Sequence, residues 1–325
     1  MLKKEFVESR NIFFKSERKH KKEVISGYKK SFDGTDIWFR RVYPVKKDNE
    51  FPPLVLCNGM GTTIRYWRYV EDYISNITDV VVWDYRGHGR SKFPKSQDVS
   101  IRALADDMKA VCDANEIKKA IFGGFSLGVQ VIFEFYRRYQ DMVSGLIPAL
   151  GPYENPAKYF MNMPITENIL DIVAKLVSLN PDLAQKIWAS IMVPSFAFKL
   201  GKSVGLISEN LFFLNPILAH IDDFTEYFEN LRKMDFTLFL RIAIESKKHS
   251  AEDILEKINV PTLVIAGESD IFTPLHVLMK IARKIKGAEL IILPKGSHGG
   301  LVEHAELVCM RIEKFIKDNF SNKKV

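Results

Sequence analysis

The chain has 325 residues, of which 46% are hydrophobic and 27% are charged, an ordinary balance for a soluble globular protein. No apolar run approaches the roughly eighteen residues that a membrane span requires, and the first residues, MLKKEF, lack the apolar core of a secretory signal. Cys57, Cys112 and Cys309 lie far apart and lack metal-ligand spacing, so we expect buried thiols in a reducing compartment. These features exclude a membrane-spanning protein and a disulfide scaffold, and they predict a cytoplasmic location.

The net charge of +7 is concentrated in the first 31 residues, which hold ten Lys and Arg against four Glu. The plainest interpretation of this basic leader, assigned to residues 1–25, is a solvated and frayed segment. The alternative is association with an anionic membrane surface, since Leu2, Phe6 and Phe13 could share one face of a basic helix. We do not expect nucleic-acid binding, because the rest of the chain is nearly neutral and carries no recognised nucleic-acid-binding motif.

Strand and helix signals alternate through two regions of the chain, which is typical of a mostly parallel sheet covered by helices. The first region predicts a hairpin of residues 27–32 and 36–43, strands at 54–57, 80–83, 119–125 and 143–150, and helices at 101–115 and 127–139. The second region predicts strands at 262–266 and 289–293, a helix from 274 and a final helix over 300–320.

Between residues 151 and 253 the strand signals disappear. Helical segments rich in Phe, Leu, Ile and Met replace them, at 169–179, 182–191, 211–219 and 224–246. We interpret this region as a helical insertion between two strands of the sheet. The predicted organisation is therefore a core of residues 26–150 and 254–325, with residues 151–253 inserted.

The sequence Gly124-Phe125-Ser126-Leu127-Gly128 places one serine between a buried strand and a helix. A serine in such a sharp turn has its hydroxyl directed outward, and the flanking glycines let strand and helix approach closely. The G-x-S-x-G pattern alone arises often by chance, but the strand-turn-helix context favours a nucleophile.

A serine hydroxyl becomes a good nucleophile when a base takes its proton and a carboxylate orients that base. Asp270 and His298 each follow a predicted strand, and the carboxyl ends of strands meet at one edge of a parallel sheet. The structural alternatives are a helix cap for Asp270 and a surface loop for His298. Glu268 is the nearest rival acid, and His88, in a turn after a strand, is a minor rival base.

The developing oxyanion of an acyl-transfer reaction needs backbone donors about 3 Å away. The amide of Leu127, directly after the serine, is predicted to be one donor. The glycine-rich turn Asn58-Gly59-Met60-Gly61 follows another strand, and we select the Met60 amide as the second. The alternative for this segment is a tight turn without a catalytic role.

These motifs, together with Asp84-Tyr85-Arg86-Gly87-His88-Gly89-Arg90-Ser91, resemble those of α/β-hydrolase-fold serine hydrolases over residues of roughly 30 to 320. The resemblance implies an α/β fold with an eight-stranded, mostly parallel sheet whose second strand is antiparallel. It also implies a helical cap inserted between strands 6 and 7, and catalysis without a cofactor or metal. Many relatives have His-Gly where this chain has Asn58-Gly59, so Asn58 is expected to orient the substrate or its loop differently.

The resemblance implies acyl transfer from substrate to Ser126 and then to water, with His298 as base and Asp270 as the orienting acid. Many aromatic residues of the insertion suit an apolar pocket, and we assign substrate contacts to Trp188, Phe196 and Phe212 and, outside the insertion, to Asn58. The predicted function is a lipase-like hydrolase of hydrophobic carboxylic esters. The alternatives are a carbon–carbon, amide or thioester hydrolase or an acyltransferase with the same triad, and, less favoured, a non-catalytic ligand receptor.

Overall fold

The structure is a computed structural model that describes residues 22–45, 51–159, 166–192 and 221–321. Its strands are β1 (Val24–Lys30), β2 (Asp36–Val42), β3 (Leu54–Cys57), β4 (Val80–Trp83), β5 (Ala120–Phe125), β6 (Val143–Ala149), β7 (Leu263–Gly267) and β8 (Glu289–Leu293). Within the described residues they form one sheet in the order β1-β2-β4-β3-β5-β6-β7-β8. The second strand is antiparallel to both of its neighbours, and all other pairs are parallel. The predicted fold class is confirmed.

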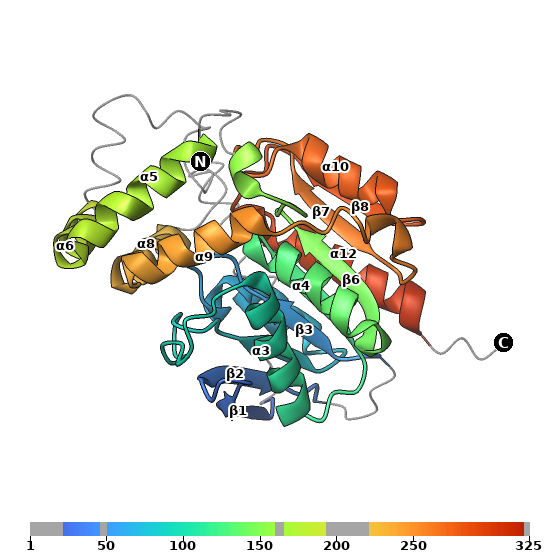
Figure 1. The fold of residues 1–325 in the computed structure, drawn as a ribbon. Coiled ribbons are helices and arrows are strands. Elements are labelled where there is room, and N and C mark those ends of the chain that lie inside the picture. The colour runs from blue at the N-terminus through green and yellow to red at the C-terminus, as the bar shows by residue number, and fades with distance from the viewer. Residues whose placement is uncertain (1–21, 46–50, 160–165, 193–220, 322–325) are drawn as a thin grey trace.

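Helices cover both faces of the sheet (Figure 1). One face packs against α3 (Ile101–Ala114), α4 (Leu127–Arg138) and α10 (Leu275–Lys284). The other face packs against α2 (Arg68–Ile74) and α12 (Ala305–Phe320). The central strands β3, β4 and β5 are short, apolar and buried along their whole length, as expected for strands enclosed between two helical layers.

Most predicted elements are confirmed within a few residues, and Ser100 caps α3 by accepting a hydrogen bond of 3.1 Å from the Ala103 amide. The predicted helix over 224–246 is wrong in one respect, since the chain forms two helices there, α8 (Ile221–Lys233) and α9 (Phe236–Lys248). The cause is Asp235, whose carboxylate accepts from the Leu238 amide at 2.7 Å and starts a new helix. The last predicted helix is likewise divided, into α11 (Gly300–Glu303) and α12.

The segment between β6 and β7 also contains α5 (Thr166–Leu179) and α6 (Pro181–Ile191), and the predicted helix over 211–219 lies outside the described residues. Figure 1 shows α5, α6, α8 and α9 grouped beyond one end of the sheet. Short 3-10 helices complete the chain, namely η1 (Ile64–Trp67), η2 (Gln140–Met142), η3 (Pro156–Lys158) and η5 (Leu255–Lys257). The helices α2 and η1 were not predicted.

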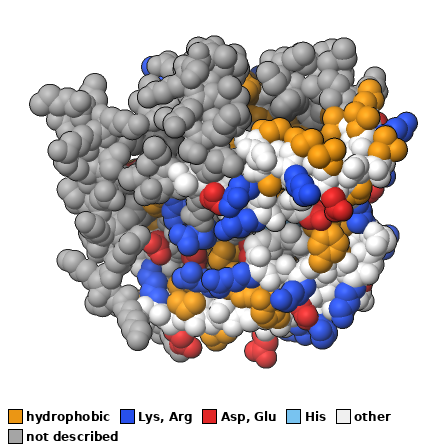
Figure 2. Space-filling view, turned by 90° about the vertical axis from the view of Figure 1, so that its left-hand side faces the viewer, with side chains coloured by type: hydrophobic (Ala, Val, Ile, Leu, Met, Phe, Trp, Pro, Cys, Tyr) orange, Lys and Arg blue, Asp and Glu red, His pale blue; other side chains and the backbone are white. Residues whose placement is uncertain are grey.

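The helices α5 and α6 carry large aliphatic side chains on the outside of the molecule. Six of these side chains are between 51% and 81% exposed, namely Ile172, Leu176 and Leu179 on α5 and Leu183, Ile187 and Ile191 on α6. Figure 2 looks at this side of the molecule and shows gathered hydrophobic side chains above Lys and Arg side chains. Among the described residues, no helix has the length and apolarity needed to cross a bilayer. All three cysteines are free and buried, as predicted.

Candidate active site

Ser126 occupies a strained turn between β5 and α4. Its backbone φ is +53°, a left-handed conformation that is unusual for a residue with a side chain. The turn is tight enough that a Cβ atom on Gly124 would lie 2.2 Å from the Gly128 carbonyl oxygen. A Cβ atom on Gly128 would lie 2.8 Å from the Cys57 carbonyl oxygen. The two glycines therefore let the serine turn form between closely packed backbones.

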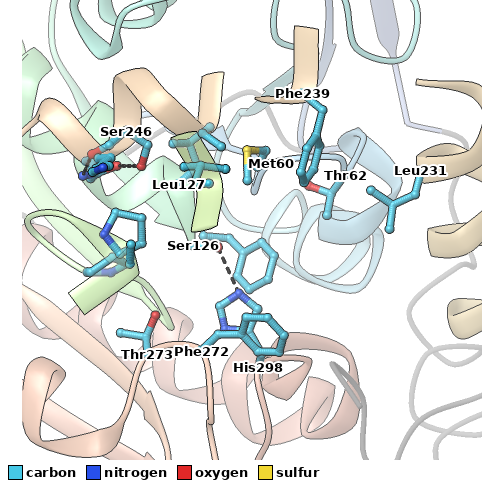
Figure 3. Close-up of a pocket in the computed structure, with 18 of the residues that line it drawn as sticks. Met60, Thr62, Ser126, Leu127, Leu231, Phe239, Ser246, Phe272, Thr273 and His298 are labelled. Atoms are coloured by element: carbon cyan, nitrogen blue, oxygen red, sulfur yellow. Dashed lines mark hydrogen bonds between the residues drawn. The ribbon is translucent and has the colours of Figure 1, made fainter. Parts of the chain in front are cut away.

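The structure brings Ser126, His298 and Asp270 together in a hydrogen-bonded row. The Ser126 Oγ lies 2.9 Å from His298 Nε2, and His298 Nδ1 lies 2.9 Å from Asp270 Oδ2 (Figure 3 shows the first of these bonds). When the Nδ1 proton is donated to Asp270, Nε2 is left free to accept the serine proton. The row therefore has the geometry of a nucleophile, a general base and an orienting carboxylate.

Asp270 and His298 are themselves held firmly. The other carboxylate oxygen of Asp270 accepts from the Phe272 amide at 2.8 Å and from the Thr273 amide at 2.9 Å. The His298 ring contacts two aromatic rings, with centroid distances of 5.2 Å to Phe125 and 5.1 Å to Phe272. Because these contacts limit rotation of both side chains, the imidazole is held facing the serine hydroxyl. The rival acid Glu268 accepts from the Lys295 amide and lies outside this row.

The amides of Leu127 and Met60 are available as donors beside Ser126. Leu127 is the first residue of α4, where backbone N–H groups have no partner within the helix and the helix dipole favours negative charge. In the described part of the chain, neither of these two N–H groups donates to another protein group. Both residues line the same cavity as the Ser126 hydroxyl. In that part of the chain, two backbone donors without a protein partner therefore belong to residues that line the cavity at Ser126.

Asn58 was predicted to orient either the substrate or its own loop. Its side chain is fully buried, is not among the residues that line the cavity, and donates to the Trp83 carbonyl at 2.7 Å. The prediction of a substrate contact is therefore wrong for Asn58, because the β3 turn directs this side chain into the core. Its role is to attach the Asn58–Gly61 turn to the end of β4.

A cavity of about 490 Å³ opens onto Ser126 and His298. It lies between the sheet and the inserted helices, and its walls are mainly aromatic and aliphatic (Figure 3). The inserted helices contribute Leu170 and Val173 from α5, Trp188 from α6, Tyr227, Phe228 and Leu231 from α8, and Phe239 and Ala243 from α9. A cavity of this size and polarity suits a small hydrophobic ligand.

Trp188, a predicted substrate contact, lines this cavity, and its ring stacks on Phe236 with a centroid distance of 4.4 Å. Its indole N–H donates to the Leu231 carbonyl at 2.7 Å, which joins α6 to α8. The other two predicted substrate contacts, Phe196 and Phe212, lie outside the described residues.

A few polar groups interrupt the apolar wall. Gln130, on α4, accepts a hydrogen bond from the Ser246 hydroxyl and donates to the Ser246 carbonyl at 3.0 Å, which attaches α9 to the helix that follows the serine. Lys247 lies near them on the same wall and forms an ion pair of 2.7 Å with Asp171. In Figure 3, Ser246 and Thr273 lie on one side of Ser126, and Leu231 and Phe239 lie on the other. Thr62 lies beside Phe239, so polar groups interrupt the apolar wall on both sides of Ser126.

The sequence analysis missed several aromatic residues of the cavity, among them Tyr66, Tyr227, Phe228 and Phe272. Tyr66 lines the cavity and stacks on Phe125 at 4.4 Å, and Phe272 covers the His298 ring. Burial raises the pKa of the Tyr66 phenol well above its ordinary value, so the group remains a hydrogen-bond donor. Tyr66 and Phe272 lie close in sequence to turns that we did predict, Asn58–Gly61 and Gly267–Asp270. Among the described residues, no group of three or more His, Cys, Asp or Glu side chains is arranged to hold a metal ion.

Comparison with known proteins gives consistent matches. A family model described as alpha/beta hydrolase fold matches residues 52–305. The protein named "Putative carbamate hydrolase RutD" of Pseudomonas syringae pv. syringae is 27% identical over 76% of this chain and 86% of its own length. A pimeloyl-[acyl-carrier protein] methyl ester esterase of Neisseria meningitidis is 25% identical over 81% of this chain and 92% of its own length. Among solved structures, a thermophilic esterase from Thermogutta terrifontis has a TM-score of 0.68 and 20% identity, and the match covers 91% of this chain and 99% of that one.

Proposed function

Because the chain belongs to the α/β-hydrolase fold family, as its motifs predicted, we propose that it is a serine hydrolase of carboxylic esters with an apolar acyl or alcohol part. The observation that carries this proposal is the row Ser126–His298–Asp270 at the edge of an apolar cavity. A hydroxyl nucleophile forms an acyl-enzyme from a carbonyl substrate, whereas relatives that process halides or epoxides use a carboxylate in its place.

The proposed reaction has two halves. Ser126 Oγ attacks the ester carbonyl carbon while its proton moves to His298 Nε2, and the Met60 and Leu127 amides bind the resulting oxyanion. The tetrahedral intermediate then collapses, the bond to the leaving alkoxy group breaks, and His298 gives the proton to that oxygen. Water next attacks the acyl-enzyme with His298 again as base, which releases the acid and restores Ser126. Asp270 holds the imidazole in place throughout.

The character of the cavity supports a hydrophobic substrate. Its aromatic and aliphatic wall would stabilise an alkyl chain by removing that chain from water, at about 25 cal/mol per Å² of apolar surface. The helices α5, α6, α8 and α9 act, in this proposal, as the cap that encloses the substrate. The sequence relatives are named for a carbamate and a methyl ester, two carbonyl substrates that an attacking serine could open.

The alternatives with the same triad are carbon–carbon, amide or thioester hydrolysis and acyl transfer to an alcohol. All of them begin with attack by Ser126 on a carbonyl, so they differ in the leaving group and in the final acceptor. A non-catalytic receptor is less favoured, because it would not require a serine with a base 2.9 Å away.

We further propose that the basic leader contacts an anionic membrane surface. The support is its local charge, eight Lys and Arg against four Glu in residues 1–25, together with the exposed aliphatic side chains on α5 and α6. Basic and apolar groups on one molecule favour reversible binding at the surface of an anionic bilayer.

Hydrolysis of p-nitrophenyl esters from acetate to palmitate, run beside Ser126→Ala, tests the proposed activity. Turnover that increases with chain length and disappears in Ser126→Ala would support a hydrolase of apolar esters. A preference for short or charged esters would contradict the apolar substrate. Without turnover, labelling of Ser126 by a fluorophosphonate would favour the alternatives with the same triad, and no labelling would favour a receptor.

A further inference from the structure

The turn that carries the Met60 amide is held at both ends by side chains from another loop. Tyr85 and His88 belong to the turn after β4, 27 positions along the chain from the residues that they contact. The Tyr85 hydroxyl donates to the Asn58 carbonyl at 2.6 Å. The Gly61 amide donates to His88 Nε2 at 3.2 Å. These two hydrogen bonds enclose Met60 from both sides.

We propose that Tyr85 and His88 form a clamp that positions the Met60 amide for the oxyanion. Both are positioning residues, since neither lines the cavity and each acts through the Asn58–Gly61 backbone. This inference rests on the proposed function, in which the Met60 N–H stabilises the negative charge that develops on the substrate carbonyl oxygen. Donors in such a site must already point toward the oxyanion, because the free energy of reorienting them during the reaction would reduce their stabilisation of the transition state.

The His88 ring has one orientation and one tautomer that suit this role. Its Nδ1 atom lies 3.2 Å from the Arg86 carbonyl, which can only accept a hydrogen bond, so the ring proton belongs on Nδ1 and Nε2 is left as the acceptor. The ring is buried, with 4% exposure, and burial lowers the pKa of His88 to about 4. The imidazole is therefore neutral at neutral pH and remains able to accept from Gly61.

Arg86 is fixed in turn by a buried ion cluster. Its guanidinium is fully buried. It lies 2.6 Å from a carboxylate oxygen of Asp107 and 3.3 Å from a carboxylate oxygen of Asp33. Tyr85 is also fully buried, and its ring packs edge-on against Trp83 and His88 with centroid distances of 4.9 Å and 5.7 Å. The clamp thus rests on a rigid part of the core, and two fixed points separated by Met60 define the orientation of the peptide between them.

Hydrolysis of p-nitrophenyl esters by variants of His88 tests the clamp directly. His88→Leu removes the acceptor, whereas His88→Gln places an amide oxygen where it can accept from Gly61. We expect His88→Leu to lower kcat roughly tenfold to hundredfold with KM nearly unchanged, because an interaction made only in the transition state is weakened. His88→Gln should recover most of that loss. His249→Leu is the matched control, since this partly buried histidine contacts Glu134 and does not line the cavity.

A purely structural role predicts a different pattern. If His88 only stabilised the fold, its loss would lower the fraction of enzyme that is competent, and kcat per competent site would stay the same. The end-point number of sites labelled by a fluorophosphonate measures that fraction. Equal losses in His88→Leu and His88→Gln per labelled site, or a kcat of His88→Leu within about threefold of wild type, would overturn the clamp. If His88→Leu does not fold, Tyr85→Phe takes its place, because it removes one oxygen only, and an unchanged kcat would again overturn the clamp.

Failure of the proposed function is a separate outcome. If the wild-type protein hydrolyses no ester, the clamp is tested by the second-order rate of fluorophosphonate labelling, since the phosphoryl oxygen occupies the position of the oxyanion. A labelling rate reduced in His88→Leu and recovered in His88→Gln supports the clamp in that case, and equal rates overturn it.

Discussion

The Ser126 Oγ atom lies 2.9 Å from Nε2 of His298, although 172 positions of the chain separate the two residues. Ser126 follows β5 and His298 follows β8, and two further strands, β6 and β7, lie between them in the sheet. The contact therefore depends on the loops beyond the carboxyl ends of the strands, among them the Asp270 loop that orients the imidazole.

The first prediction concerns this row of residues. Ser126→Ala and His298→Ala should each lower kcat by about 10⁴-fold or more, and Asp270→Asn by a comparable or smaller factor. The double variant Ser126→Ala/His298→Ala should lose little more than Ser126→Ala, because the residues act as one unit. Steady-state kinetics on the best ester measures these effects. Fully additive losses would contradict a shared mechanism.

The second prediction concerns the serine turn. Gly124→Ala should destabilise the protein by about 1–3 kcal/mol or prevent folding, since its new methyl group would meet the Gly128 carbonyl oxygen at 2.2 Å. Gly27→Ala, on β1, is the matched control, because its new methyl group would find its nearest atom at 4.0 Å. Urea unfolding of both variants measures the difference. Equal stability of the two variants would show that the turn is looser than described.

The sequence predicted the frame of the site because the relevant signals are local. Short apolar runs in the sequence show where each strand begins and ends. Ser126, Asp270 and His298 each lie just after the carboxyl end of such a strand. Parallel strands present their carboxyl ends at one edge, so the three side chains could be expected to converge. The glycines at 124 and 128 made the serine turn recognisable for the same local reason.

Other features depend on packing between distant segments, which a single sequence does not reveal. Asn58 follows β3 as predicted, but its side chain bonds to the Trp83 carbonyl in the core, so its assignment to the substrate was wrong. The turn after β4 suggested His88 as a minor rival base, whereas its Nε2 contacts the Gly61 amide. The break between α8 and α9 was missed because the apolar periodicity continues through Asp235.

The third prediction concerns substrate length. Trp188→Ala should enlarge the cavity on the α6 side, so that kcat/KM for long esters increases roughly tenfold relative to short ones. Trp188→Phe is the control, since it removes less volume, keeps an aromatic ring beside Phe236 and also loses the hydrogen bond to the Leu231 carbonyl. The p-nitrophenyl ester series gives the ratio. A uniform loss at every chain length would show that Trp188 stabilises the cap without limiting the substrate.

The fourth prediction concerns the basic leader. Deleting residues 1–21 should abolish sedimentation with anionic vesicles and leave sedimentation with neutral vesicles unchanged. The deletion ends before Lys22, because the Lys22 ammonium donates to the Asp72 carbonyl at 2.6 Å and to the Ser75 hydroxyl at 2.9 Å. Ester hydrolysis in solution reports whether the truncated protein remains folded. Unchanged sedimentation of an active truncated protein would contradict a lipid-binding leader.

The fifth prediction concerns pH and stability, and it rests on Glu71. Its side chain is 6% exposed, and burial raises its pKa from 4.5 to about 7. The Arg40 Nε atom lies 3.0 Å from one carboxylate oxygen but forms no hydrogen bond with it, so the neighbouring positive charge only partly offsets the cost of burial. The unfolded chain has no such burial and ionises near the ordinary value.

Between pH 4.5 and about 7 the folded protein therefore holds more protons at Glu71 than the unfolded chain does. The free energy of unfolding from this group is thus highest below pH 4.5 and falls as the pH rises to about 7. Glu71→Gln does not ionise, so it should gain stability relative to wild type between pH 5 and pH 8, by about 3 kcal/mol at most. Urea unfolding at both pH values measures the change.

Glu313→Gln is the control. Burial alone would raise the pKa of Glu313, but hydrogen bonding to its carboxylate and the positive charge of Lys317 together outweigh burial, and the pKa is lowered. The difference in stability between Glu313→Gln and wild type should therefore stay constant over the same pH range. A pH-independent difference for Glu71→Gln would show that the Arg40 guanidinium fully compensates the buried carboxylate.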